Sequence, residues 1–232
     1  MSVDPFYKAG NFYRRHLPHW QPPSSIIFVT YRIAGSLPTG FTEALIDEKE
    51  NLTKQALLHG KTKDEAYEWI HKILFQRIDQ AFVETLESDY SSKMPQWLSN
   101  PRITKVVSDA FHYWDGKRYK LHRYVIMPNH VHILIEPLEI FKDSDIKREQ
   151  VDNGIRFWQL SKIMQGLKGY SARQANEILG RKGQFWHDES FDHWIRNQGE
   201  LDETYEYIDL NPVKAGLCKK PEDWKWSSAG EK

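Results

Sequence analysis

Apolar and polar positions follow two different rhythms along this chain, and the change between them marks its elements. Stretches rich in β-branched and aromatic residues predict strands at residues 26–33, 117–127, 130–136 and 190–196. Apolar residues spaced three and four apart predict helices: a pair within 42–89, and single helices at 102–113, 154–179 and 199–210. The last helix is expected to end before Pro212, because the residue before a proline disfavours the α conformation.

The order of these elements predicts the fold class. With residues 42–95 set aside as a helical insertion, the remaining order is βαββαβ followed by one C-terminal helix. That order is typical of the ferredoxin-like split arrangement, in which helices cover one face of an antiparallel sheet. We therefore expect an α+β protein with a single domain over residues 1–232 and the insertion at 42–95 within it.

Composition narrows the classes of protein that remain. The 232 residues are 40% hydrophobic and 28% charged, which allows both a core and a polar surface. The single Cys218 excludes an internal disulfide and a zinc ribbon. The chain has no apolar run long enough for a membrane span, and its start has no apolar signal segment. We therefore expect a cytoplasmic protein without a membrane partner.

Two histidines are the first candidates for chemistry. His130 and His132 are separated by one residue on a predicted strand, so both side chains leave one face while Val131 points into the opposite layer. Imidazole is the commonest metal ligand among protein side chains, and two on one strand supply neighbouring positions around an ion. The same spacing also occurs in half-buried polar residues of a sheet, so the pair alone leaves both interpretations open.

The last predicted helix supplies candidates for the rest of a site. Tyr207 and Asn211 are four residues apart and share one face of that helix, whereas Tyr205 points elsewhere. If this face lies across from the histidines, it forms a His–His–Asn metal site with a nucleophilic phenol one turn away. The alternative is that Tyr207 only packs and that Asn211 is a turn residue before Pro212.

Several segments, in the same order, resemble one known family. They are YVIMPNHVHILIEP, LKGYSARQAN, GQFWHDESFDHWIRN and YIDLNPVKAGL, preceded by RRHLPHWQPPSSIIFVTYRIAGSLP near the start. Together they resemble the REP-associated tyrosine transposases, a branch of the single-tyrosine HUH nucleases. The resemblance covers roughly residues 11–40 and 97–230. It leaves the segment 42–95 unmatched.

The resemblance implies a role for each candidate. The HUH pair of the family falls on His130 and His132 as metal ligands, its nucleophile falls on Tyr207 in YIDLN, and its third metal-binding position falls on Asn211. Tyr170 in LKGYSARQAN is a rival nucleophile that ranks second, because the Tyr207 motif runs directly into a Pro-Val pair as the pattern of the family does.

The implied activity is transesterification on single-stranded DNA, at repeats that form hairpins. Tyr207 attacks the scissile phosphate and leaves a 5′-phosphotyrosine and a free 3′-hydroxyl. The implied cofactor is Mg²⁺ or Mn²⁺, which neutralises charge that develops on the phosphate oxygens and favours ionisation of a phenol whose ordinary pKa is about 10. The functional unit is expected to be a monomer or a homodimer, with the site completed in cis or by the partner.

DNA binding requires locally clustered positive charge, because the 32 basic and 32 acidic residues cancel. The expected DNA-binding side chains lie near the start of the chain, on or beside the second predicted strand and on the predicted helix 154–179: Arg14, Arg15, Arg118, Lys120, Arg123, Lys168 and Arg173. A solvated helix face explains many such charges equally well. Asp192 and Arg196 share a face of the fourth predicted strand and are expected to orient the site from behind its ligands.

Other classes of protein fit part of this pattern. A histidine-triad hydrolase needs a third histidine where Leu134 stands, and a zinc hydrolase would use Glu136 as its carboxylate ligand. A non-enzymatic protein could bind single-stranded nucleic acid through the face of the sheet. Sensitivity to EDTA and to Tyr207→Phe distinguishes the nuclease from the binding protein.

Overall fold

Strands and helices follow one another along the chain in nearly the predicted order. The computed structural model describes residues 11–14, 18–21, 25–87, 94–139, 150–152, 155–157 and 159–231. Its strands are β1 Asn11–Arg14, β2 Pro18–Gln21, β3 Ile27–Ile33, β4 Tyr119–Ile126, β5 His130–Pro137, β6 Gln150–Asp152, β7 Ile155–Phe157 and β8 Trp186–Trp194. Its α-helices are α1 Phe41–Leu58, α2 Lys63–Glu87, α3 Pro101–Trp114, α4 Leu160–Leu179 and α5 Gln198–Lys214.

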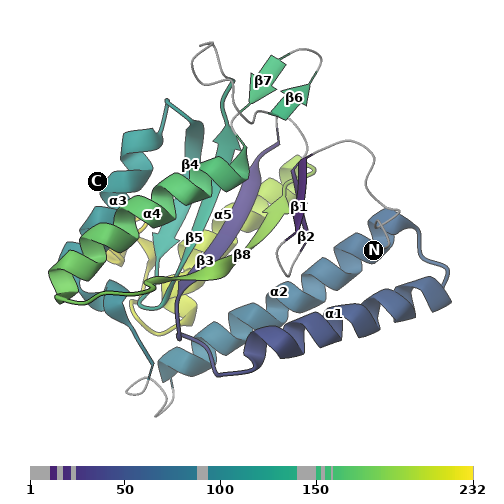
Figure 1. Ribbon diagram of the computed structural model, residues 1–232, viewed down its shortest axis with the longest axis horizontal. Coiled ribbons are helices and arrows are strands. Elements are labelled where there is room, and N and C mark those ends of the chain that lie inside the picture. Colours follow the sequence, from purple (N-terminus) through teal and green to yellow (C-terminus); the bar gives the residue numbers. More distant parts are fainter. Residues whose placement is uncertain are drawn as a thin grey trace.

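The central antiparallel sheet has the strand order β4-β5-β3-β8 (Figure 1). The chain reaches these strands by the path β3-α3-β4-β5-α4-β8, which is the predicted βαββαβ order. A tight turn at Pro128 and Asn129 joins β4 to β5, and the Met127 amide closes it by donating to the His130 carbonyl. The α+β class and the antiparallel sheet are therefore confirmed, with β3 and β5 at the centre.

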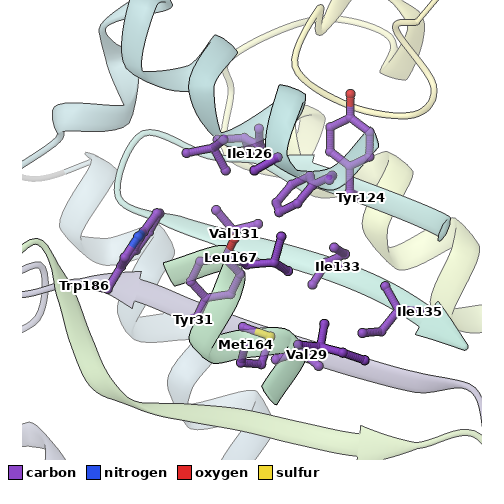
Figure 2. Packing of buried hydrophobic residues seen from close by; sticks show 14 of the residues in the cluster. Val29, Tyr31, Tyr124, Ile126, Val131, Ile133, Ile135, Met164, Leu167 and Trp186 are labelled. Atoms are coloured by element: carbon purple, nitrogen blue, oxygen red, sulfur yellow. The ribbon is translucent and has the colours of Figure 1, made fainter. Parts of the chain in front are cut away.

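One face of the sheet forms the main hydrophobic core (Figure 2). Alternate residues of three strands point into it and are almost fully buried: Val29, Tyr31, Tyr124, Ile126, Val131, Ile133 and Ile135. Helices α3 and α4 close this face, α4 with Met164 and Leu167. Burying one such side chain contributes about 1.5 to 3 kcal/mol. The intervening strand residues, including both histidines, are thereby directed to the opposite face.

Helices cover the opposite face as well, which corrects the expectation that they lie on one face only. The apolar side chains buried there come from three strands, from the turn after β4 and from α5: Phe28, Val125, Leu134, Met127 and Ile208. Helix α2 of the insertion lies over the same face, where the ring of Phe75 packs edge-on against Phe28. The strands are apolar on both faces, so their pattern alone does not show how many layers cover them.

Two helix boundaries differ from the predicted ones. The helix predicted at 154–179 begins only at Leu160, because β6 and β7 pair with each other before it. Helix α5 continues through Pro212 to Lys214, although its pattern predicts an end before the proline. A proline inside a helix removes one donor and crowds an earlier carbonyl, at a cost of about 3 kcal/mol. Here Ile208, Asn211 and Pro212 are buried together, and this packing offsets that cost.

The insertion is a pair of helices, as predicted, and α1 and α2 lie side by side (Figure 1). Thr62 begins α2 with a reciprocal cap: its amide donates to Glu65 Oε2 at 2.8 Å, and the Glu65 amide donates to Thr62 Oγ1 at 3.4 Å. Leucine, isoleucine and phenylalanine side chains of the pair form a second core that continues to Phe191 of β8. The insertion is thus packed onto the sheet through shared apolar side chains.

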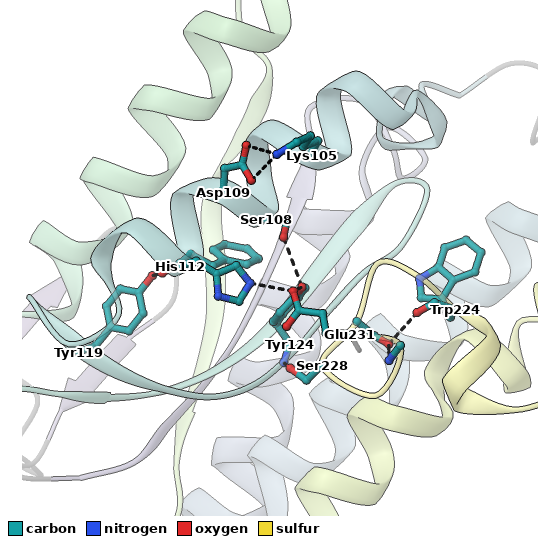
Figure 3. A network of polar contacts seen from close by, with 12 residues as sticks. Lys105, Ser108, Asp109, His112, Tyr119, Tyr124, Trp224, Ser228 and Glu231 are labelled. Carbon is teal, nitrogen blue, oxygen red and sulfur yellow. Dashed lines mark hydrogen bonds and ion pairs between the residues drawn. The ribbon is translucent and has the colours of Figure 1, made fainter.

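The C-terminal segment protects the edge of the sheet at β4. The Ile126 amide donates to the Trp226 carbonyl at 2.8 Å, and the Ser228 amide donates to the Tyr124 carbonyl at 3.0 Å. Beyond this point Glu231 accepts from the Tyr124 hydroxyl and lies 2.8 Å from His112 Nε2 of α3 (Figure 3). An unpaired edge strand is prone to pair with other chains. These contacts cover the edge and tie the chain that follows α5 to the sheet.

Candidate functional site

His130 and His132 lie next to each other on the second face of the sheet. They are 2% and 0% exposed, and their Nε2 atoms are 3.0 Å apart. The register of β3 and β5 places Thr30 opposite His132 and Arg32 opposite His130. The shared face was expected from strand alternation, whereas the convergence of the two Nε2 atoms is decided by the packing around them.

The second nitrogen of each imidazole is held by a neighbouring side chain. Thr30 Oγ1 lies 2.7 Å from His132 Nδ1, and Asn129 Oδ1 lies 2.6 Å from His130 Nδ1. Contacts of this kind orient the rings of metal-binding histidines. Burial lowers the pKa of His132 to about 3 and lowers the pKa of His130 well below its ordinary value. Both rings are therefore neutral near pH 7, the form that binds a metal ion.

Helix α5 brings Tyr207 and Asn211 to the same point. The Tyr207 hydroxyl and the Asn211 amide nitrogen each lie 3.3 Å from His132 Nε2. The two residues are one turn apart and so share the helix face that meets the sheet. We call His130, His132, Tyr207 and Asn211 the histidine–tyrosine cluster. Its four side chains come from β5 and α5 of the same chain.

The inserted helix α2 closes the cluster from the other side. The Tyr207 hydroxyl donates to Asp79 Oδ1 at 2.5 Å. The ring of Phe75 lies edge-on to that of Tyr207, with centroids 5.3 Å apart, and the ring of Phe82 stacks on His130 with centroids 4.0 Å apart. The segment that has no counterpart in the sequence resemblance therefore forms one wall of the candidate site.

The pKa of the Tyr207 phenol depends on its burial and on the charged residues around it. Burial, followed by the negative charge and hydrogen bond of Asp79, raises the pKa of Tyr207 well above its ordinary value. Burial also raises the pKa of Asp79, while the hydrogen bond from Tyr207 and the charge of Lys214 act in the opposite direction. The Lys214 Nζ lies 5.3 Å from the centroid of the Tyr207 ring. Without further positive charge, Tyr207 is a protonated phenol at neutral pH.

Two imidazoles and one amide are available to hold a divalent ion. An ion about 2.1 Å from neighbouring octahedral ligands places them about 3.0 Å apart, and the Nε2 atoms of His130 and His132 have that separation. A half-turn of the Asn211 amide would bring its oxygen to face His132. Across the described ranges, no three His, Cys, Asp or Glu side chains are grouped to hold a metal ion. The fit therefore rests on two histidines, one amide oxygen and further oxygens from water or phosphate.

The predicted DNA-binding residues differ in whether their charged groups are exposed or are engaged in contacts within the protein. Lys120 and Arg173 are exposed. Arg14 lies in β1, where the structure describes only the backbone, and Arg15 lies outside the described residues. Among the predicted residues whose side chains are described, Lys120 and Arg173 are therefore the best placed for a DNA phosphate.

Three other predicted DNA-binding residues are engaged within the protein. The Arg118 guanidinium lies 3.6 Å from the centroid of the Trp114 ring. Arg123 forms an ion pair with Asp209 of α5 at 3.6 Å. The Lys168 ammonium donates to two backbone carbonyls of β8, at 2.6 and 3.1 Å. These contacts connect the sheet with its surrounding helices.

The residues expected to support the site from behind lie elsewhere. Asp192 pairs with Val29 across the sheet, so its side chain lies on the face of the main core, opposite the histidines. That expectation is wrong, because the fourth strand places its odd-numbered residues on the histidine face. Arg196 follows β8 and forms an ion pair with Glu68 of α2, so its charge fastens the insertion to the sheet.

The structure does not bring together the residues that the alternative nucleophile, the histidine-triad hydrolase and the zinc hydrolase would need. Tyr170 is 44% exposed on α4, the helix that covers the main core and not the histidine face. Leu134, at the place a third histidine would need, is buried beside Phe28. Glu136 lies 3.0 Å from His122 Nε2 and pairs with that residue instead of completing a zinc site. None of the three belongs to the histidine–tyrosine cluster.

Four residues around the cluster were missed from the sequence: Thr30, Asp79, Asn129 and Lys214. Lys214 could have been found from the sequence, because residues at i, i+4 and i+7 from Tyr207 share a helix face. Asn129 and Thr30 became relevant only once the turn and the register of β3 against β5 were known. Asp79 carried no signal, because tertiary packing decides which face of α2 meets the sheet.

A buried histidine at the contact between α2 and β8 is expected to make the stability of the protein depend on pH. His71 of α2 packs against His193, with ring centroids 4.3 Å apart, and its Nε2 lies 3.2 Å from the Asp192 carbonyl. Burial, with the charge of His193 adding to it, lowers the pKa of His71 well below its ordinary value. The unfolded chain takes up this proton near pH 6.5 and the folded chain does not, so stability present above pH 6.5 is lost as the pH falls below it.

From pH 7.5 to pH 5 we expect His71 to account for a loss of about 1 to 2 kcal/mol in the free energy of unfolding, measured by urea denaturation. His71→Gln should lose that part of the pH dependence and keep the rest. Identical slopes of stability against pH in the two proteins would contradict the prediction.

Comparisons with known proteins give one distant likeness. No family model matches the sequence, and no curated protein matches it. A solved structure of a REP-associated tyrosine transposase bound to a REP hairpin is 16% identical, with a TM-score of 0.48, and the match covers 93% of this chain and 81% of that one. In the part of the chain that is described, no helix is both long and apolar enough to cross a membrane. The function of this chain is therefore inferred from its own site.

Proposed function

We propose that this chain is a metal-dependent enzyme that cleaves and rejoins single-stranded DNA through a covalent bond to Tyr207. The observation that carries the proposal is the histidine–tyrosine cluster. The Tyr207 hydroxyl lies 3.3 Å from His132 Nε2, which in turn lies 3.0 Å from His130 Nε2, although the tyrosine is more than seventy residues away from both histidines in the sequence. A tyrosine can act as the nucleophile of covalent catalysis, and a divalent ion beside it can stabilise charge that develops on a phosphate.

The chemistry on this proposal is an exchange of phosphate esters. The Tyr207 oxygen attacks the phosphorus of a DNA linkage, the bond from phosphorus to the 3′-oxygen breaks, and the 3′-oxygen takes up a proton from water. The products are a 5′-phosphotyrosine and a 3′-hydroxyl. The proton of Tyr207 passes to Asp79 Oδ1, which already accepts its hydrogen bond. A bound Mg²⁺ or Mn²⁺, held by His130, His132 and Asn211, supplies positive charge for the phosphate oxygens.

The side chains that are exposed near the Tyr207 phenol indicate the direction from which DNA approaches it. Tyr207 and Asp79 are partly exposed, and Lys214 beside them is exposed, whereas both histidines are buried. A phosphate therefore approaches from the side of Lys214, whose charge favours it. Hairpin-forming single strands are the substrate class that we propose.

The test is covalent capture of labelled DNA. The full chain is incubated with hairpin-forming single-stranded oligonucleotides, taken from repeats beside its own gene, in the presence of Mn²⁺ or EDTA, and is then run on a denaturing gel. We expect a protein–DNA adduct with Mn²⁺ and none with EDTA. In Tyr207→Phe the adduct is expected to be lost, because the attacking oxygen is absent.

Tyr170→Phe is the matched control, because it removes a phenol from the opposite side of the sheet and should leave the adduct unchanged. An adduct that persists in Tyr207→Phe would refute Tyr207 as the nucleophile. Binding without cleavage under all conditions would favour the non-enzymatic alternative. That alternative receives no support from the sheet itself, since helices cover both of its faces across the described residues.

A further inference from the structure

We infer that Thr85 of the inserted helix α2 is a positioning residue that sets which nitrogen of His130 faces the histidine–tyrosine cluster. The inference rests on the proposed function, because it concerns how a metal ligand of that site is presented. It assigns a role to a segment that the sequence resemblance leaves unmatched. Thr85 touches neither substrate nor metal and acts through Asn129.

A continuous series of hydrogen bonds connects α2 to the imidazole. The Thr85 hydroxyl donates to the Phe82 carbonyl at 2.8 Å within α2. The Asn129 amide nitrogen donates to Thr85 Oγ1 at 3.0 Å, and Asn129 Oδ1 lies 2.6 Å from His130 Nδ1. Thr85 and Asn129 are 4% and 1% exposed, so bulk water does not compete for these groups.

The direction of each bond follows from the one before it. The Thr85 hydroxyl has a single proton, which goes to the Phe82 carbonyl, so its oxygen offers a lone pair. That lone pair selects the nitrogen end of the Asn129 amide and turns the oxygen end toward His130. An oxygen facing His130 Nδ1 requires a proton on that nitrogen. His130 therefore carries its proton on Nδ1 and presents the lone pair of Nε2.

The lone pair of His130 Nε2 faces the point where an ion would bind. The His130 Nε2 atom lies 3.0 Å from His132 Nε2. The ring of Phe82 stacks on the His130 ring at an interplanar angle of 8° and holds it in this orientation. Phe82 and Thr85 are three residues apart on α2, so one helix face orients the ring and fixes its proton. With the amide reversed, His130 would present an N–H to the site and could not bind a cation.

The decisive comparison is between Thr85→Val and Thr85→Ser. Valine keeps the shape of threonine and removes the hydroxyl, so it frees the amide of Asn129 to turn. Serine keeps the hydroxyl. Long-range ¹H–¹⁵N correlation spectra of the full labelled chain report which ring nitrogen of His130 is protonated, with signals assigned from the spectrum of His130→Gln. Calorimetric titration with Mn²⁺ alone reports the affinity of the site.

We expect the wild-type chain and Thr85→Ser to show His130 protonated on Nδ1. In Thr85→Val we expect a mixture of the two forms and a loss of Mn²⁺ affinity of about tenfold or more, the usual range for groups that orient a ligand. A wild-type His130 protonated on Nε2 would overturn the inference even if Thr85→Val failed to fold. An unchanged proton position and affinity in a folded Thr85→Val would also overturn it.

Failure of the proposed function gives a different result. If the wild-type chain binds no Mn²⁺ while His130 is protonated on Nδ1 and shifts in Thr85→Val, then the positioning by Thr85 holds and the metal site does not. Loss of binding equal in Thr85→Val and Thr85→Ser, with unchanged His130 signals, would show a packing effect and would refute the role of the hydroxyl.

Discussion

Replacing His132 with glutamine is expected to reduce DNA adduct formation by about 10³-fold, which corresponds to about 4 kcal/mol. His132 Nε2 is the centre of the histidine–tyrosine cluster, at 3.0 Å from His130 Nε2 and 3.3 Å from both Tyr207 and Asn211. Glutamine is similar in length and can still donate a hydrogen bond to Thr30 through its amide nitrogen, but it lacks the imidazole lone pair that faces the cluster. Adduct yield per unit time and Mn²⁺ affinity, measured side by side, test this prediction.

His122→Gln is the matched control for this experiment. His122 lies on β4 of the same sheet and is also hydrogen-bonded on both nitrogens, to Tyr205 at 2.9 Å and to Glu136 at 3.0 Å. It lies outside the cluster, so Mn²⁺ affinity should stay at the wild-type value. If His132→Gln kept adduct formation within a few-fold of wild type, the two imidazoles would not be the metal ligands.

Replacing Phe82 with alanine is expected to lower the free energy of unfolding by about 3 to 5 kcal/mol. Phe82 is 2% exposed, belongs to the core shared by α1, α2 and β8, and stacks on His130. Its removal leaves a cavity between α2 and the sheet that rigid neighbours on both sides cannot fill. Urea denaturation followed by circular dichroism measures the loss.

Leu58→Ala is the control for the insertion, because that leucine is 85% exposed at the end of α1 and should change stability by less than about 0.5 kcal/mol. A loss below about 1 kcal/mol in Phe82→Ala would mean that α2 does not rest on the histidine face in solution. Two transitions in the denaturation curve would show instead that the insertion unfolds separately from the sheet.

The sequence by itself determined the elements of the central sheet and the residues that meet on it. Alternation along β5 placed His130 and His132 on one face, and helical spacing placed Tyr207 and Asn211 together on α5. These are local relations, set by backbone geometry over a few residues. For the same reason the predicted path βαββαβ agrees with the structure, and the pair of helices in the insertion was recognised from the spacing of its apolar residues.

Only the tertiary structure decided what surrounds the site. The end of α5 beyond Pro212, the face on which Asp192 lies and the position of α2 over the histidines depend on packing between distant segments. Asp79 and Thr85 lie in a helix that is polar on much of its surface, and nothing in its pattern shows which side meets the sheet. That choice follows from burying Phe75 and Phe82 together with residues of β3, β5 and β8, a relation between side chains far apart in the sequence.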